Sequence, residues 1–323
     1  MSEPLISVLV LTYHPQKDAL FSTLRSIVLQ KDCDYEVIVC DDGSGEFYQP
    51  EIREFLDAHG TSYQILAHEE NQGTVKNILD GVKAARGTYI KPISPGDYLY
   101  DAFTLRDIGI FMAQHDAKAA FGRMVFYACD PDLTVKNLTH PVLPEIYGAE
   151  KTAYPYRKAL KQQSVYGDLI CGASAIYEKT AFAQALETVA PGVRLAEDTV
   201  FQLFAAENTR IWHLDRLVVW YEHGTGVSTQ KPAQRFTRID ADLYRFCFLM
   251  AERFPNDPYI KRACHLWQLR KDGSRLQNLL AKLRPDKLVF SLRVKCRRKS
   301  LGIPQYNDEF FHQCHRAADA TKG

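Results

Sequence analysis

The sequence lacks the patterns that would mark several common protein classes. Its eight cysteines are scattered and form no Cys-x-x-Cys pair, which argues against a disulfide framework and against a structural zinc site. No Gly-x-Gly-x-x-Gly follows the first predicted strand, and no Gly-x-x-x-x-Gly-Lys-Ser/Thr occurs, so dinucleotide-binding and P-loop interpretations lose their main support. The apolar run Leu5–Leu11 is too short to span a membrane and lacks the basic flank of a secretion signal. These features predict a protein that is made and kept in the cytoplasm with reduced thiols.

The chain also has little net charge. It contains 323 residues, of which 46% are hydrophobic and 24% are charged, and its net charge is +1. That composition is typical of a globular protein and predicts no general attraction to nucleic acid. The charge is uneven, however, because Asp286 is the only acid in the basic stretch between Lys282 and Lys299. We expect any contact with a polyanion or a membrane surface at that end of the chain.

Strands and helices alternate over the first part of the chain. Apolar runs typical of buried strands occur at residues 6–11, 36–40, 63–67 and 88–93. Apolar residues at helical spacing lie between them. This alternation predicts an α/β fold with a mostly parallel central sheet and helices on both faces. In such sheets, ligands bind beyond the carboxyl ends of the strands.

The second part of the chain is less regular. Residues 127–165 contain four prolines and weak periodicity, which predicts a long excursion over the active face. Strands are predicted at 169–178 and 211–223, and a short helix at 197–206. From about Pro232 the pattern is helical without strands. We therefore expect a domain at residues 1–230 and a helical C-terminal region at residues 231–323.

Polar groups follow each of the first four predicted strands. They are Thr-Tyr-His at 12–14, Cys-Asp-Asp-Gly-Ser-Gly-Glu at 40–46, the stretch 68–77, and Ser-Pro-Gly-Asp at 94–97. Neighbouring aspartates repel one another unless donors or a ligand stabilise them. The Asp-Asp-Gly-Ser stretch alone is compatible with an ordinary type I turn. Because all four strand ends meet at one edge of the predicted sheet, together they favour a binding site.

Five stretches carry a resemblance to a known family: ISVLVLTYHP, EVIVCDDGSGE, NQGTVKN, GTYIKPISPGDYL and AEDTVFQLF. In order and spacing they resemble the inverting family-2 glycosyltransferases of the GT-A nucleotide-diphospho-sugar transferase fold, over roughly residues 5–225. The resemblance implies transfer of a sugar from a nucleotide diphosphate, usually UDP, to a hydroxyl of a saccharide or lipid-linked acceptor in polysaccharide biosynthesis. It also implies a divalent metal cofactor, Mn²⁺ or Mg²⁺.

The resemblance assigns nucleotide-binding roles to residues at the first three strand ends. Tyr13 would lie against the base, and Thr12 would line its pocket. Asp42, or its neighbour Asp41, would accept a hydrogen bond from the base, a task that suits a carboxylate because charge-assisted bonds are strong. Lys76 would neutralise the diphosphate as a point charge. The alternative for Lys76 is a solvated helix face.

The resemblance implies a metal site with fewer carboxylate ligands than usual at the fourth strand end. Where the family has two or three aspartates, this chain has Ser94–Asp97, so Asp97 alone carries the metal-ligand role, and the hydroxyl of Ser94 would lie near the ribose. Mg²⁺ is commonly held by one or two carboxylates together with substrate phosphates and waters. His223 is a second candidate ligand, and an ordinary hydrogen-bonded histidine is the alternative. For Asp97 the alternative is a strand-ending turn and helix cap.

The catalytic base implied by the resemblance is Asp198. The pair Glu197–Asp198 opens a predicted helix, where acids are also favoured by the helix dipole. An inverting transfer needs a base that removes the acceptor proton as the hydroxyl attacks the anomeric carbon. Such catalysis contributes about 10²–10⁴-fold to the rate.

The segment 282–300 mixes apolar and basic residues in the way of a helix lying on an anionic membrane. A solvated basic face is the alternative. Attachment to the inner face of the membrane would concentrate the enzyme near a lipid-linked acceptor.

Two other functions remain open. One is a sugar nucleotidyltransferase, which is disfavoured by the missing Gly-rich loop after the first strand. The other is a catalytically silent nucleotide-sugar-binding subunit of a polysaccharide-assembly complex.

Overall fold

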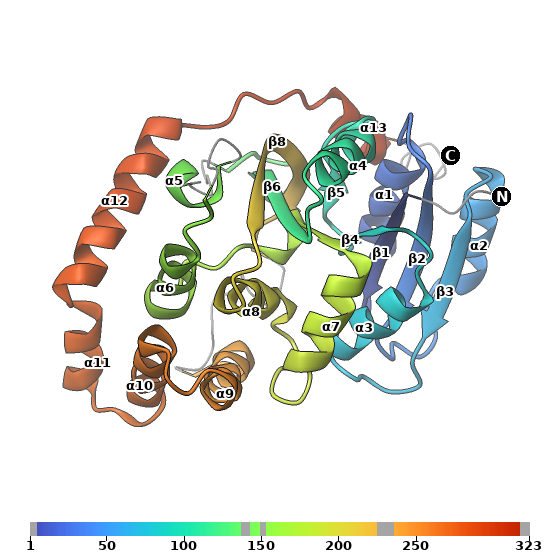
Figure 1. Ribbon diagram of the computed structural model, residues 1–323. Helices are drawn as coiled ribbons and strands as arrows, with labels where there is room; N and C mark the ends of the chain where they lie inside the picture. The colour runs from blue at the N-terminus through green and yellow to red at the C-terminus, as the bar shows by residue number, and fades with distance from the viewer. Residues whose placement is uncertain (1–4, 137–142, 149–152, 225–235, 317–323) are drawn as a thin grey trace.

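The computed structural model describes residues 5–136, 143–148, 153–224 and 236–316 (Figure 1). Over these residues the chain forms one eight-stranded sheet in the order β3-β2-β1-β4-β7-β6-β8-β5. The strands are β1 (Ile6–Thr12), β2 (Tyr35–Asp41), β3 (Tyr63–Ala67), β4 (Tyr89–Ile93), β5 (Tyr98–Leu99), β6 (Ala119–Tyr127), β7 (Ala175–Glu178) and β8 (Ile211–Glu222).

Helices surround the sheet and continue into the C-terminal region. Those before β8 are α1 (Lys17–Val28), α2 (Gln49–Ala58), α3 (Thr74–Ala84), α4 (Thr104–Gln114), α5 (Pro144–Tyr147), α6 (Tyr156–Tyr166), α7 (Lys179–Val189) and α8 (Val200–Ala206), with 3₁₀ turns η1 (Gly172–Ser174) and η2 (Glu197–Thr199). Those after β8 are α9 (Arg238–Arg253), α10 (Pro258–Asp272), α11 (Arg275–Lys282), α12 (Pro285–Leu301) and α13 (Glu309–Arg316). Among the described helices, none is both long enough and apolar enough to cross a membrane.

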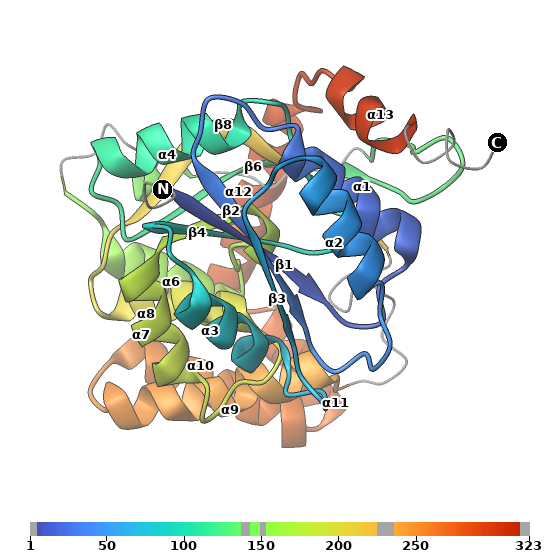
Figure 2. The same ribbon diagram turned by 90° about the vertical axis from the view of Figure 1, so that its right-hand side faces the viewer.

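Strands β1, β2, β3 and β4 are parallel to one another, as the alternation of strands and helices predicts. Side chains along β1 alternate between two cores: Val8 and Val10 pack with α1, α2 and α4, whereas Leu9 packs with α3 and α7. Figure 2 shows α1 and α2 on one side of β1–β3 and α3 on the other. Strand β7 then joins antiparallel to both β4 and β6, so the sheet is mixed beyond β4.

Three segments differ from the expectations drawn from the pattern of residues. The strand expected at 169–178 begins only at Ala175, after the 3₁₀ turn η1. Strand β6 was not expected, and the stretch expected as an excursion contains α6, where Ala159 and Leu160 are among the few inward apolar side chains. An apolar stripe this narrow gives a weak helical signal. The helix depends instead on packing against α8 and α10.

The C-terminal helices contact the sheet domain at several places, two of which bury apolar side chains completely. Phe246 and Met250 of α9 and Ile260 of α10 belong to the same hydrophobic core as α6 and α8. At the other end, α13 packs on α1 and the β5 edge, where Phe311 and Cys314 are buried. Figure 1 shows α11 and α12 along one edge of the molecule, with a long connection from α12 to α13. The boundary expected near residue 230 falls in 225–235, outside the described residues.

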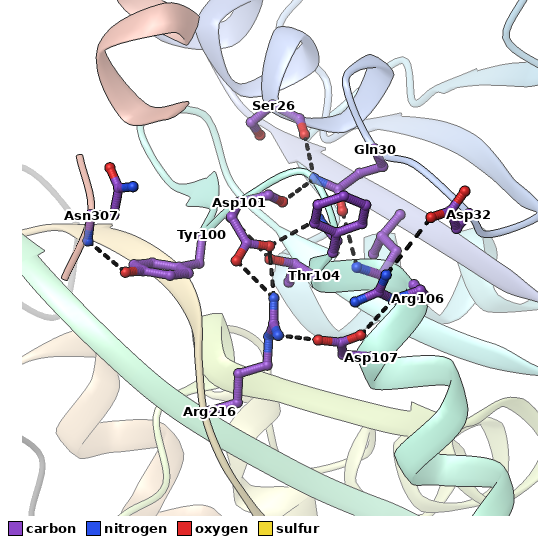
Figure 3. Close-up of polar contacts among 12 residues, drawn as sticks. Ser26, Gln30, Asp32, Tyr100, Asp101, Thr104, Arg106, Asp107, Arg216 and Asn307 are labelled. Atoms are coloured by element: carbon purple, nitrogen blue, oxygen red, sulfur yellow. Dashed lines mark hydrogen bonds and ion pairs between the residues drawn. The ribbon is translucent and has the colours of Figure 1, made fainter. Parts of the chain in front are cut away.

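A polar network fixes the position of β8. Arg216 on β8 forms ion pairs with Asp101, at 2.7 Å, and with Asp107 on α4 (Figure 3). Close by, the backbone N–H of Asn307 donates to the Tyr100 hydroxyl at 2.8 Å, which fixes the C-terminal connection to the same region. The network aligns β8, whose last residues reach the site described below.

Candidate functional site

A cavity of about 340 Å³ opens at the carboxyl ends of β1 and β4. Its walls come from segments far apart in the chain. They are the end of β1 with Leu11, the turn from Ser94 to Asp97, residues 171–173, the segment 195–198, the end of β8 with Tyr221 and Glu222, and α9 with Ile239 and Leu243. The cavity therefore lies where ligands bind in open α/β sheets.

The Ser94–Asp97 turn holds Asp97 against the cavity. The Asp97 N–H donates to the Ser94 carbonyl at 2.9 Å, and the Thr23 hydroxyl donates to the Asp97 carbonyl at 2.8 Å. One carboxylate oxygen of Asp97 accepts from the backbone N–H of Glu222 at 3.1 Å. Burial raises the pKa of Asp97 to about 7, although the Glu222 N–H and the charge of Lys91 act in the opposite direction. A ligand that supplies positive charge would stabilise the ionised form.

A second carboxylate, that of Glu222, lies beside this turn. Gly96 has a φ of 96°, and a Cβ there would lie 1.9 Å from Glu222 Oε2. Glycine is therefore required for the close approach. Asp97 and Glu222 both line the cavity, which fits Mg²⁺ or Mn²⁺ held by one or two carboxylates plus phosphate oxygens. Within the described residues, no group of three or more His, Cys, Asp or Glu side chains is arranged to hold a metal alone.

Below the cavity, Lys91 is a fully buried cation in the middle of β4. Its Nζ donates to the carbonyls of Pro92, at 2.6 Å, and Ala173, at 2.8 Å. Burial lowers the pKa of Lys91 to about 8, while Asp97 opposes that shift. Lys91 thus joins β4 to the 171–173 wall and places positive charge near Asp97.

The predicted base lines the same cavity. Glu197 and Asp198 form the turn η2, and both side chains line the cavity. Burial raises the pKa of each carboxyl, and the charge of Asp198 raises that of Glu197 further, so the pair holds a proton more tightly than exposed carboxyls do. A Cβ on Gly172 would lie 2.5 Å from Glu197 Oε1, so the glycine gives this carboxyl its space.

At the first two strand ends, hydrogen bonds hold the polar groups in place. Asp41 is buried and accepts from the Thr12 hydroxyl at 2.7 Å, and from the Ser44 hydroxyl and N–H at 2.6 and 2.8 Å. This leaves Asp41 little capacity for a ligand. Tyr13, in contrast, is 54% exposed at the end of β1, so its ring face is accessible.

Asp42 directly follows β2, and Lys76 lies on α3, after β3. Asp42 accepts from the backbone N–H groups of residues 72 and 73, at 2.7 to 3.2 Å, so it joins the end of β2 to the loop after β3. Lys76 is exposed on α3 and pairs with Asp80 one turn later, with one N–O distance of 2.6 Å. Binding of a phosphate by Lys76 would require its side chain to leave Asp80.

The structure brings some of the expected residues into one cavity. Ser94, Asp97 and Asp198 line it. The other expected residues lie along the same sheet edge but do not line the cavity; they are Thr12, Tyr13, Asp41, Asp42, Lys76 and His223. The backbone N–H of His223 donates to the Tyr127 carbonyl at 2.8 Å. Glu222 and Lys91 were missed by the analysis of the sequence. The signal for Lys91 was a lone charge inside an apolar strand, which indicates a buried partner.

Comparisons with known proteins now decide the family. Residues 7–185, more than half of the chain, match the model for "Glycosyl transferase family 2". The chain belongs to glycosyl transferase family 2. It is therefore a glycosyltransferase, and its mixed sheet with surrounding helices is the GT-A fold. A search of curated proteins finds no match.

Solved structures resemble this family member over most of its length. A crystal structure of residues 1–349 of S. aureus TarS has a TM-score of 0.56 at 18% identity and covers 93% of this chain and 81% of its own. The same TarS fragment in complex with UDP-GlcNAc has a TM-score of 0.56 at 19% identity, with 90% and 79% covered. A complex of TarS with UDP has a TM-score of 0.54 at 18% identity. At these identities the likeness shows a shared fold.

Proposed function

We propose that this enzyme is an inverting glycosyltransferase that moves a sugar from a nucleotide diphosphate, UDP in the first instance, to a hydroxyl of a saccharide or lipid-linked acceptor. The observation that carries the proposal is the cavity that both Asp97 and Asp198 line, at the carboxyl ends of β1 and β4. A cavity with both carboxylates can take a metal-bound donor phosphate at Asp97 and an attacking hydroxyl at Asp198. The choice of UDP is supported by the complexes of the TarS fragment with UDP and UDP-GlcNAc.

The nucleotide is proposed to bind along the ends of β1 and β2. Tyr13 would stack on the base, since aromatic faces bind planar rings. Asp42 would accept the hydrogen bond from the base, and Asp41, which is bonded to the Thr12 hydroxyl, would hold the shape of the pocket. Ser94, exposed at the end of β4, would contact the ribose.

The diphosphate is proposed to lie between Lys76 and the carboxylates of Asp97 and Glu222. These carboxylates would hold Mn²⁺ or Mg²⁺, with His223 as a further candidate ligand. When bound, the metal supplies positive charge that stabilises the leaving diphosphate. Lys91 neutralises part of the acidic wall from below, and Lys76 would add a point charge from α3.

Asp198 is proposed to act as the general base. It lines the cavity, and burial raises the pKa of its carboxyl, which makes its carboxylate a stronger base than that of an exposed aspartate. A carboxylate is far too weak to ionise an alcohol beforehand. Removal of the acceptor proton must therefore be concerted with attack on the anomeric carbon, from the face opposite the leaving group.

A screen of nucleotide sugars tests this function. The protein is incubated with Mn²⁺, an acceptor mixture and individual UDP-, GDP- and TDP-sugars, and released nucleoside diphosphate is measured. We expect release of UDP from a UDP-sugar. NMR of the product should show an anomeric configuration opposite to that of the donor. Retained configuration would exclude the inverting mechanism. Release of pyrophosphate from a nucleoside triphosphate and a sugar phosphate would favour a nucleotidyltransferase. Binding of a nucleotide sugar without turnover would favour a catalytically silent subunit.

We further propose that residues 1–230 form the domain that carries the catalytic and nucleotide-binding residues, and that 231–323, besides supplying α9 to the cavity wall, add a surface for the inner face of a membrane. The helices α11 and α12 expose apolar side chains, of which Val289 is 71% exposed; the others are Leu276, Leu279, Leu280, Leu283, Leu288 and Leu292. Basic residues of the 282–299 stretch flank them. Apolar groups flanked by cations match an anionic lipid surface.

Vesicle sedimentation tests this surface. Deleting 282–323 would also remove Phe311 from the core, so point substitutions are preferable. Val289→Glu with Leu292→Glu should abolish sedimentation with phosphatidylglycerol vesicles, and phosphatidylcholine vesicles should bind neither protein. Ile110→Glu is the matched control, because Ile110 is 49% exposed on α4, outside this surface. Unchanged sedimentation of the double variant would refute the membrane role.

A further inference from the structure

The carboxylate of Asp242 on α9 binds the segment that leads into the catalytic turn. Asp242 is 1% exposed. One of its oxygens accepts from three consecutive backbone N–H groups, those of Arg194 at 3.0 Å, Leu195, and Ala196 at 3.3 Å. The next two residues are Glu197 and Asp198. The position of the proposed base is thus set by a side chain from the C-terminal region.

The same segment contacts the loop after β3. The Val75 N–H donates to the Arg194 carbonyl at 3.0 Å, and the Arg194 guanidinium donates to the Asn71 carbonyl at 2.6 Å. A Cβ on Gly73 would lie 2.2 Å from Arg194 Cγ, so glycine permits this packing. Residues 194–196 therefore lie between the proposed nucleotide side and the catalytic turn.

The face of α9 that carries Asp242 also forms part of the cavity wall. Ile239, three residues before Asp242, lines the cavity, and so does Leu243, four residues after Ile239. Residues three or four apart are neighbours on the surface of a helix, so Ile239 is next to both Asp242 and Leu243. The other oxygen of Asp242 pairs with Arg245, whose Nε donates to the Gly192 carbonyl at 3.0 Å. Helix α9 is thus in contact with the segment 192–198 at several points.

We propose that Asp242 is a positioning residue for Asp198 and that α9 is part of the catalytic unit; this inference rests on the proposed function. Three N–H groups directed at one carboxylate oxygen form charge-assisted hydrogen bonds, which are stronger than neutral ones. They fix the backbone that ends in η2. Without them Asp198 shifts relative to the acceptor hydroxyl, and a displacement of about 1 Å can cost about 10²-fold in rate.

The test compares two buried aspartates on α9. Asp240 is 7% exposed and pairs with Arg270 of α10 at 2.9 Å, so Asp240→Asn removes a comparable ion pair that does not reach the catalytic segment. Asp242→Asn should lower kcat by about 10- to 100-fold. Its donor KM should change by less than about threefold, because Asp42 holds residues 72 and 73 independently. Asp240→Asn should leave both constants close to wild type.

A second variant and a double-variant comparison keep the result decisive. Arg245→Gln perturbs Asp242 more mildly and should lower kcat by a smaller factor with the same unchanged KM. In an Asp198→Asn background, Asp242→Asn should cause no further loss of residual turnover. Equal kcat for the Asp242, Arg245 and Asp240 variants, or an identical loss in both backgrounds, would overturn the positioning role. Full turnover by Asp198→Asn alone would instead overturn the proposed function.

Discussion

The carboxylate of Asp97 accepts a hydrogen bond from the backbone N–H of Glu222, 125 residues later in the chain, at 3.1 Å. This contact joins the turn after β4 to the end of β8. It places two carboxylates on one cavity wall, with the buried cation Lys91 below them. An acidic wall of this kind is costly without a ligand, and it becomes favourable when a cation and a phosphate bind.

The first prediction concerns the stability of Asp97→Asn. The pKa of Asp97 rises from an ordinary 3.8 to about 7 in the folded protein, so the folded state binds this proton more tightly than the unfolded chain does. The resulting stabilisation is complete below the unfolded pKa and is lost as pH rises through about 7. Urea unfolding measures the free energy of unfolding at about pH 5 and about pH 8. Between these two pH values the wild type should lose about 2–3 kcal/mol more of this free energy than Asp97→Asn does. Parallel pH dependence of the two proteins would contradict the burial of an ionisable Asp97.

The second prediction concerns metal binding. Because the described residues supply two neighbouring carboxylates and no larger cluster, Mn²⁺ affinity should be negligible alone and clear in the presence of UDP. Asp97→Ala should remove the UDP-dependent binding, and Glu222→Gln should weaken it by at least about tenfold. Electron paramagnetic resonance of free Mn²⁺ measures both effects. Equal binding by Asp97→Ala with UDP present would exclude this residue as a ligand.

The third prediction separates the two carboxyls of η2. Because Asp198 is the proposed base, Glu197→Gln should keep most of the turnover. Activity should fall at low pH as Asp198 is protonated, and this acidic limb should lie at the same pH in the variant. The measurement is kcat from about pH 5 to about pH 9. Loss of turnover in Glu197→Gln would instead identify Glu197 as the base.

The fourth prediction concerns the competition between Asp80 and the donor for Lys76. An exposed ion pair contributes at most about 1 kcal/mol, so Asp80→Asn should tighten UDP binding by no more than about fivefold. Lys76→Ala should weaken it, most clearly at low salt. Calorimetric titration at two ionic strengths gives both Kd values. Wild-type affinity in Lys76→Ala at low salt would show that Lys76 belongs to the helix surface alone.

The sheet was predictable because its strands carry their own signal. Continuous apolar runs such as 6–11 and 36–40 are buried on both faces, and the polar residues at their ends mark the active edge. Strand β6 and helix α6 were not predictable in the same way. Gly122 interrupts β6, and α6 is mostly polar, so both depend on neighbours that fold from distant parts of the chain.

Sequence position alone indicated three residues that line the cavity: Ser94 and Asp97 follow a strand, and Asp198 lies at the start of a helix. Their roles stay predictions. Glu222 and Asp242 carry no such signal, because their importance comes from the segments they approach in space. The pairing of Lys76 with Asp80 follows from their spacing of four residues on a helix, yet a sequence alone does not decide whether a ligand competes for the lysine.

The role of Asp198 as the general base is tested by the turnover of Asp198→Asn, measured beside its affinity for UDP. We expect a loss of at least about 10²-fold in sugar transfer. UDP binding should stay within about threefold of wild type, because the substitution keeps the shape of the cavity wall and removes only the proton acceptor. Transfer at the wild-type rate by a folded, UDP-binding Asp198→Asn protein would contradict this role.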